Sequence, residues 1–239
     1  LYSTDAGKSH TYCFGCRTRK ELNPSTELPE VIKEKRITNM ISGITEALPK
    51  RKIDSETCKI FNYETGEYNG TKVHIANYFD KNYKKVAQHI RFPDKKFIWL
   101  GEPNDISLFG QQNWRDGGRT IIITEGEIDC MSVSKVQGNR YPCVSVPSGA
   151  ASAKKYITNE LEWLSKFENI ILMFDNDEAG LKASVDCANI LPVRKVKIAK
   201  LQAKDPSELL MTGRGDKIVN AVFEAKSYTP QGIIKGSDT

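Results

Sequence analysis

The sequence predicts an α/β fold in which a parallel β-sheet is covered by helices on both faces, preceded by a mixed α+β section. In the second half of the 239-residue chain, short apolar runs alternate with helical patterns at the spacing of strand–helix–strand units. These runs are apolar at consecutive positions, as in strands buried on both faces. Strand candidates in the first half alternate apolar and polar residues instead. The chain therefore changes strand type near its middle.

The first half divides into three sections. Residues 1–28 predict a short β-rich module around Cys13-Phe-Gly-Cys16, and residues 29–40 are charged, as in a linker with some helical tendency. Residues 41–118 form the mixed, basic section. The elements expected there are a helix over 55–60 and strands over 73–79 and 85–91.

The second half, residues 119–227, predicts the parallel sheet and its helices. The expected strands cover 120–124, 142–146, 169–174 and 195–201. The expected helices cover 128–136, 152–167, 178–190, 206–211 and 217–226. Residues 228–239 read as the start of a linker.

Composition and charge narrow the class of protein. The apolar and charged fractions, 39% and 27%, are ordinary for a globular chain, and no apolar run is long enough to span a bilayer. The opening residues are polar and do not predict a signal peptide, and the six scattered cysteines indicate a reducing compartment. We therefore expect a cytoplasmic protein with no membrane partner.

Charge is spread unevenly along the chain. Residues 1–100 carry a net charge of +6 and residues 101–239 a net charge of −1. A basic first segment and an acid-rich second segment are typical of an enzyme that binds a polyanion and a metal ion. The alternative is a modest excess of positive charge on a solvated surface.

Acidic residues follow the apolar runs of the second half. Glu125 ends the first run, Asp175 and Asp177 end the third, and Asp205 comes shortly after the fourth. Because ligands bind outside the carboxyl ends of parallel strands, we expect these groups to converge. Each has a second interpretation, since Asp177 and Asp205 are also suited to cap helices.

Converging carboxylates repel one another unless a cation lies between them. Mg²⁺ prefers oxygen ligands and is held by a few carboxylates together with substrate phosphates. An acidic cluster without Cys or His favours Mg²⁺ or Mn²⁺ over Zn²⁺. The sequence therefore predicts a magnesium or manganese site.

The arrangement resembles the Toprim domain, a Rossmann-like metal-binding fold of primases and topoisomerases. Its pattern is a Glu after the first strand and Asp-x-Asp after a later one, matched by Glu125, Asp175 and Asp177, and Asp129 matches the Asp that follows in primases. The resemblance implies that Glu125, Asp175, Asp177 and Asp205 bind Mg²⁺ and that Asp129 assists catalysis.

A closer resemblance is to the primase half of the primase–helicases of short-tailed T-odd phages. The motifs that carry it are Leu108-Phe-Gly110, Trp114-x-x-Gly-Gly118, Thr124-Glu-Gly-Glu-Ile-Asp129, Ser148-Gly-Ala-Ala-Ser-Ala-Lys-Lys155, the run Ile171–Gly180 and Lys204-Asp205. It implies a DNA primase, a DNA-directed RNA polymerase that joins ribonucleoside triphosphates on single-stranded DNA in the cytoplasm of an infected bacterium. A replicative helicase, fused or associated, and a DNA polymerase are the implied partners.

Cationic and aromatic residues interleave between His89 and Trp99, as in proteins that hold phosphates and stack bases. The resemblance places Arg91 and Lys95 on nucleotide- or template-binding positions, with Lys96 beside them. His89 stands where the family tends to have Lys, which alters its charge at neutral pH. The other interpretation is a solvated strand edge.

Cys13 and Cys16, preceded by His10, make half of a zinc ribbon, because structural zinc takes four ligands. We expect the other Cys pair upstream of Leu1, as the phage resemblance implies. His10 with another group, or no zinc at all, are the alternatives.

Two other functions fit the acidic pattern. A Toprim-type nuclease would degrade nucleic acid without needing ribonucleotides. A non-catalytic single-stranded DNA-binding module would bind equally well with or without Mg²⁺.

Overall fold

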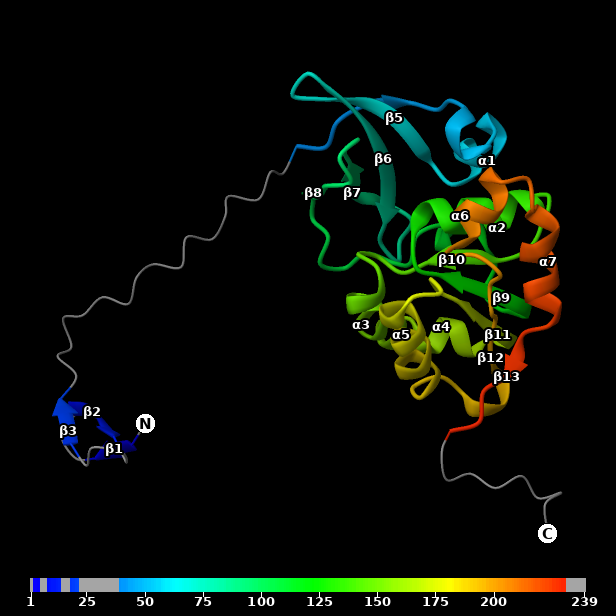
Figure 1. Ribbon diagram of the computed structural model, residues 1–239. Helices are drawn as coiled ribbons and strands as arrows, with labels where there is room; N and C mark the ends of the chain where they lie inside the picture. The colour runs from blue at the N-terminus through cyan, green and yellow to red at the C-terminus, as the bar shows by residue number, and fades with distance from the viewer. Residues whose placement is uncertain (1, 5–7, 14–17, 22–38, 231–239) are drawn as a thin grey trace, which may run out of the picture. The chain divides into compact units, whose positions relative to one another are not determined.

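The computed structural model describes residues 2–4, 8–13, 18–21 and 39–230 (Figure 1). The chain separates into two units, Leu1–Arg36 and Ile37–Thr239. In the first unit, β1 (Tyr2–Thr4), β2 (Lys8–Cys13) and β3 (Thr18–Glu21) form an antiparallel sheet in that order. The zinc prediction concerns Cys16 and the side chain of Cys13, which lie outside the described part of the chain.

The second unit begins with a five-stranded antiparallel sheet in the order β4-β5-β6-β7-β8. Its strands are β4 (Gly43–Ile44), β5 (Tyr63–Tyr68), β6 (Thr71–Phe79), β7 (Lys85–Arg91) and β8 (Phe97–Gly101). The predicted strands 73–79 and 85–91 are the two central ones. Asn69 and Gly70, both with positive φ, close the two-residue β5–β6 hairpin, as the twist of paired strands requires.

Two short helices accompany this sheet. The 3₁₀ turn η1 (Pro49–Arg51) precedes α1 (Ser55–Ile60), which is the predicted helix. Asp54 caps α1, because its side chain accepts a hydrogen bond from the backbone N–H of Thr57 at 2.8 Å. A further 3₁₀ turn, η2 (Gln111–Asn113), leads toward the second sheet.

The second sheet has the order β10-β9-β11-β12-β13. Its strands are β9 (Gly118–Thr124), β10 (Cys143–Ser145), β11 (Phe167–Met173), β12 (Val196–Ile198) and β13 (Lys226–Ser227). The first four in that spatial order are parallel, as predicted, and β13 is an antiparallel edge strand that the sequence prediction missed. Ile121, Ile122 and Ile123 of β9 are all buried, as expected of a central strand covered on both faces.

Helices cover both faces of this sheet (Figure 1). One group packs together as α2 (Glu127–Val136), α6 (Pro206–Met211) and α7 (Gly215–Phe223). The other comprises α3 (Ala150–Asn159), α4 (Leu161–Ser165) and α5 (Glu178–Ala188), and the turn η3 (Val193–Lys195) precedes β12. Among the described residues, no helix is both long and apolar enough to cross a membrane.

Two predicted helices were placed wrongly. The helix expected over 152–167 is two helices that divide at Glu160, and Phe167 begins β11. Glu160 is buried and accepts a hydrogen bond from Gln111 Nε2 at 2.9 Å, a tertiary contact that local periodicity does not report. The helix expected over 217–226 starts earlier and ends at Phe223, because the chain then pairs with β12.

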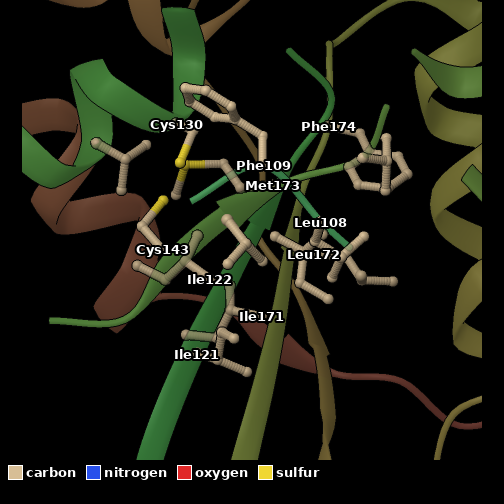
Figure 2. Close-up of a cluster of buried hydrophobic side chains, with 14 of the residues drawn as sticks. Leu108, Phe109, Ile121, Ile122, Cys130, Cys143, Ile171, Leu172, Met173 and Phe174 are labelled. Carbon is tan, nitrogen blue, oxygen red and sulfur yellow. The ribbon is translucent and has the colours of Figure 1, made fainter. Parts of the chain in front are cut away.

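One hydrophobic core joins the two sheets. Leu108 and Phe109, which connect them, are buried in the same hydrophobic cluster as Ile121 and Ile122 of β9 and Leu172 of β11 (Figure 2). Phe109 also exchanges backbone hydrogen bonds with Ser145 of β10, at 3.0 and 3.2 Å. The antiparallel sheet is thereby fixed beside the carboxyl ends of the parallel strands.

Candidate functional site

A pocket of about 640 Å³ opens where the antiparallel sheet meets the carboxyl ends of the parallel strands. Its acidic wall includes Glu125, Glu127, Asp129, Asp175 and Asp205. Its basic wall includes Arg51, His89, Arg91 and Lys95. Most of the predicted acidic and basic residues therefore face one cavity, but Asp177 and Lys96 are not among the residues that line it. Three further charged residues, Arg51, Glu127 and Lys204, line it although the sequence interpretation had not selected them as site residues.

Glu125 lies immediately after β9, at the end of the buried strand. Burial raises the pKa of its carboxyl group, and hydrogen bonds from the backbone N–H groups of Ala150 and Asp175 act in the opposite direction. Its Oε2 atom is buried and has no hydrogen-bond partner. An acceptor left in this state costs free energy unless a cation or a donor completes it.

Asp175 follows β11 and faces the same pocket. Burial, followed by the nearby charges of Glu125 and Asp205, raises its pKa from 3.8 to about 7. Lys204 opposes this shift, with Nζ 3.9 Å from Asp175 Oδ2 and 3.9 Å from Asp177 Oδ2. The backbone N–H of Asn176 donates to the Lys204 carbonyl at 2.7 Å, which holds the two loops together.

The helix after Asp175 approaches its backbone very closely. A Cβ atom on Gly180, in the first turn of α5, would lie 2.2 Å from the Asp175 carbonyl oxygen. This contact explains why glycine stands at this point of the motif, since any side chain would push helix and loop apart. The position of the acidic loop is therefore set by backbone packing as well as by charge.

Asp177 and Asp205 cap helices, as one of the two interpretations of each residue predicted. Asp177 Oδ1 accepts from the backbone N–H of Gly180 at 3.0 Å, and Asp205 Oδ1 accepts from that of Glu208 at 2.7 Å. Each cap uses Oδ1 and leaves the second oxygen of the carboxylate for other partners. Asp177 Oδ2 lies near Lys204 Nζ, and Asp205 lines the pocket.

Asp129 lies in the first turn of α2 and is partly buried, like Glu125, Asp175 and Asp205. Burial, followed by the charges of Asp205 and Asp175, raises its pKa well above the ordinary value. Its Oδ1 accepts a hydrogen bond from the backbone N–H of Ser207 at 3.1 Å, which ties α2 to α6. Its position suits a supporting role behind Asp205 and Asp175.

The donor chemistry of this wall fits a divalent cation such as Mg²⁺. All the predicted ligands offer carboxylate oxygen, and Glu125 Oε2 is a buried acceptor without a partner. Within the described residues, no group of three or more His, Cys, Asp or Glu side chains is already arranged to hold a metal ion. Lys204 lies near Asp175 and Asp177 in this arrangement and partly neutralises them.

The predicted cations of the antiparallel sheet differ in their placement. Arg91 at the end of β7 and Lys95 in the β7–β8 turn both line the pocket. Lys95 has a positive φ of 67°, a conformation fixed by the tight turn. Lys96 is exposed and pairs with Asp94, 2.8 Å from Nζ to Oδ2.

His89 is buried, although the sequence interpretation treated it as one of the binding groups. Its Nδ1 lies 2.6 Å from Glu127 Oε1, and the Tyr78 hydroxyl donates to the same oxygen at 2.8 Å. Burial acts to raise the pKa of Glu127, but His89 and the two hydrogen bonds outweigh it and lower that pKa. Glu127 stands two residues after Glu125 in the sequence, and this position was the signal that could have identified it as a pocket residue.

Arg51 reaches the pocket from η1. Its Nη1 donates to Ser207 Oγ at 3.2 Å and lies 3.8 Å from Met211 Sδ, both on α6. It thus places a cation beside the acidic wall from a turn that lies between β4 and α1. In the sequence Arg51 is one of a run of three basic residues, and nothing local distinguishes it from its neighbours.

Comparison with known proteins matches both sections of this unit. Residues 43–101 match a family described as bacteriophage T7 DNA helicase/primase, N-terminal a+b fold, and residues 122–210 match a Toprim-like family. The DNA helicase/primase of Enterobacteria phage T3 is 34% identical over 236 residues, which cover 94% of this chain and 42% of the relative. The matched part is less than half of the length of the T3 relative, and the same holds for a DNA primase of Campylobacter jejuni and a primase homolog protein of Arabidopsis thaliana.

Two solved structures are similar over most of the chain. The primase fragment of the bacteriophage T7 primase-helicase protein is 38% identical with a TM-score of 0.74, covering 89% of this chain and 90% of the fragment. A T7 lagging-strand DNA polymerase complex contains primase domains bound to an RNA/DNA hybrid and dTTP. The matching chain is 38% identical with a TM-score of 0.75, covering 80% of this chain and 100% of that one.

Proposed function

This chain belongs to the primase part of the bacteriophage T7-type helicase/primase family, and we propose that it synthesises short RNA primers on single-stranded DNA. The observation that carries the proposal is the single pocket in which Glu125 and Asp175 face Arg91 and Lys95. A carboxylate wall suits a metal-bound triphosphate, and a cationic wall suits the phosphates of a nucleic acid.

The proposed substrates are ribonucleoside triphosphates. The 3′-oxygen of one nucleotide forms a bond to the α-phosphorus of the next, the bond between the α- and β-phosphates breaks, and pyrophosphate and a proton are released. A bound Mg²⁺ ion supplies Lewis-acid stabilisation of the phosphoryl oxygens and lowers the pKa of the attacking hydroxyl group. We assign Glu125, Asp175, Asp177 and Asp205 as the residues that would hold it, with Asp129 in support.

The chain's own cations position the phosphates in this scheme. Arg91 and Lys95 hold nucleotide or template from the antiparallel sheet, and Lys96 adds charge at the exposed turn. Arg51 is added to this set, because it lines the pocket beside Ser207. His89 acts indirectly through its contact with Glu127.

Several wider assignments belong to the same proposal. A fused or associated helicase and a DNA polymerase are proposed partners, because the T3 relative is a helicase/primase and the T7 primase domains were solved with a polymerase. The proposal also includes Zn²⁺ bound by Cys13 and Cys16. It places the protein in the cytoplasm of an infected bacterium. The subdivision at 1–28, 29–40, 41–118, 119–227 and 228–239 is kept as the proposed domain plan.

The experiment measures incorporation of labelled ribonucleotides on single-stranded DNA with Mg²⁺. Extension of a supplied oligoribonucleotide is measured in parallel, because it bypasses recognition of a starting site. The double variant D175N/D177N is expected to lose synthesis by at least a hundredfold, while the exposed-site variant D105N keeps it. Near-normal synthesis by D175N/D177N would refute the metal assignment, and degradation of labelled template in place of synthesis would establish a nuclease.

A further inference from the structure

We propose that Phe97 is a stacking surface for a nucleobase at the mouth of the pocket, held in place by His89 and Trp99. The proposal rests on the function proposed above, because it names the part of the nucleotide or template that this surface would take. The ligand chemistry is a planar heteroaromatic base whose own phosphate lies near a cation.

The first support is the geometry of three aromatic rings on neighbouring strands. His89 of β7 pairs directly with Trp99 of β8, and Arg91 pairs with Phe97. The His89 ring is stacked against the Phe97 ring at a centroid distance of 4.8 Å with 22° between planes. It is also stacked against Trp99 at 4.3 Å and 17°. The His89 ring therefore stacks with both neighbouring rings, and neither of the two interplanar angles exceeds 22°.

The second support is that the inner members of this stack are fixed from several sides. His89 is held by Glu127 at 2.6 Å, and Trp99 Nε1 donates to Ser148 Oγ at 3.3 Å, across to the parallel-sheet section. Tyr78 packs edge-on against Trp99 at 4.9 Å. A rigid aromatic surface loses little conformational entropy when a ligand stacks on it.

The third support is the contrast in exposure along the stack. His89 is 8% exposed, whereas Phe97 is 45% exposed and lines the pocket that contains Glu125 and Asp175. An apolar ring kept in water at the mouth of a charged pocket, on a base of stacked rings, is the arrangement by which proteins hold the bases of single strands.

The fourth support is the charge around the ring. The guanidinium carbon of Arg91 lies over the Phe97 ring, 5.6 Å from its centre, so a base that stacks on Phe97 would share this surface with the guanidinium group, and Lys95 lines the same pocket. An apolar protein segment would gain little beside these cations, because it offers them no negative charge. A nucleotide satisfies both features, since its base covers the ring and its phosphate reaches the cation.

Three variants separate stacking from other roles of Phe97. F97L keeps apolar bulk and removes the plane, and F97W restores a plane. Y141L is the matched control, because Tyr141 is a 60% exposed aromatic residue close before β10, at the amino end of the parallel sheet. Thermal melting of each variant checks that the fold is intact.

Binding is measured in two arms, without relying on synthesis. One arm uses single-stranded DNA containing 2-aminopurine, and the other uses 2-aminopurine ribonucleoside triphosphate, whose fluorescence is quenched on stacking. If Phe97 stacks a base of the template, the effect appears with the single-stranded DNA; if it stacks a base of the incoming nucleotide, the effect appears with the triphosphate. In that measurement F97L is expected to weaken binding about 5- to 100-fold and to lose the quenching, as loss of one base stack predicts. F97W and Y141L are expected to bind like the unaltered protein.

Unchanged binding and quenching by F97L in both arms would overturn the proposal and leave primer synthesis untouched. Weakened binding that F97W does not restore would also overturn it, because the plane would then not be the cause. If the unaltered protein makes no primers, the proposed function fails, while the quenching arms still report whether Phe97 stacks a base.

Discussion

Replacing Asp175 by Asn is expected to stabilise the protein in the absence of divalent cations. In the folded chain its pKa is about 7, against 3.8 for an unperturbed Asp. Below the lower value the carboxyl group is protonated in both folded and unfolded chains, so it has no effect on stability. As pH rises toward 7 the folded chain must retain the proton or bury a charge, and stability is lost.

The magnitude follows from this shift of about three pH units, which corresponds to about 4 kcal/mol of unfolding free energy above pH 7. The attraction of Lys204, whose Nζ is 3.9 Å from Asp175 Oδ2, is already included in this net shift, because it opposes the effects of burial and of the neighbouring carboxylates. Asp175 is only partly buried, so screening by solvent reduces the effect, and we expect D175N to be more stable by about 3 kcal/mol at pH 8. For a domain of this size that is roughly 6–12 °C in melting temperature.

Thermal melting in EDTA at pH 4 and pH 8 measures the effect. D175N should match the unaltered protein at pH 4 and exceed it at pH 8, while D105N, at an exposed position, should match it at both. Added Mg²⁺ should raise the melting temperature of the unaltered protein at pH 8 and leave D175N unchanged. Equal melting temperatures of D175N and the unaltered protein in EDTA at pH 8 would show that the charge of Asp175 does not lower the stability of the folded chain.

Three further predictions concern residues around the pocket. K204A should lower stability at pH 8 in EDTA by about 1 kcal/mol and leave it unchanged at pH 4, because a cation beside Asp175 is lost; urea unfolding measures it. G180A should destabilise by about 3 kcal/mol or more, since its Cβ would meet the Asp175 carbonyl at 2.2 Å; a melting curve like that of the unaltered protein would contradict the close approach. R51A should raise the KM for ribonucleotides about tenfold, because a charged contact to phosphate would be lost. R51K should recover part of this loss. An unchanged KM would show that Arg51 does not contact the nucleotide.

The parallel sheet and its acidic edge were predictable because both depend on local sequence. The consecutive isoleucines at 121–123 predict a buried strand wherever they occur, and an acid directly after such a strand lies at its carboxyl end by geometry alone. Glu125 and Asp175 were found in this way. The same reasoning anticipated that Asp177 caps a helix, whereas its part in binding a metal ion stays a prediction.

What could not be predicted depends on contacts between distant segments. Arg51 looks like its basic neighbours until η1 packs against α6. His89 was predicted to be one of the nucleotide- or template-binding residues, yet it is buried against Glu127, 38 residues further along the chain. The break at Glu160 likewise follows from its contact with Gln111 and not from its own helical pattern. Only the assembled chain brings these partners together.

The bridge between Phe109 and Ser145 has a consequence for the proposed primer synthesis. Because one apolar interior holds the cationic strands beside the carboxylate edge, separating them would expose that interior to water at a cost of many kcal/mol. Under the proposed function, substrates would therefore enter and products would leave without separation of the two sheets. The movements required would be those of side chains around the pocket.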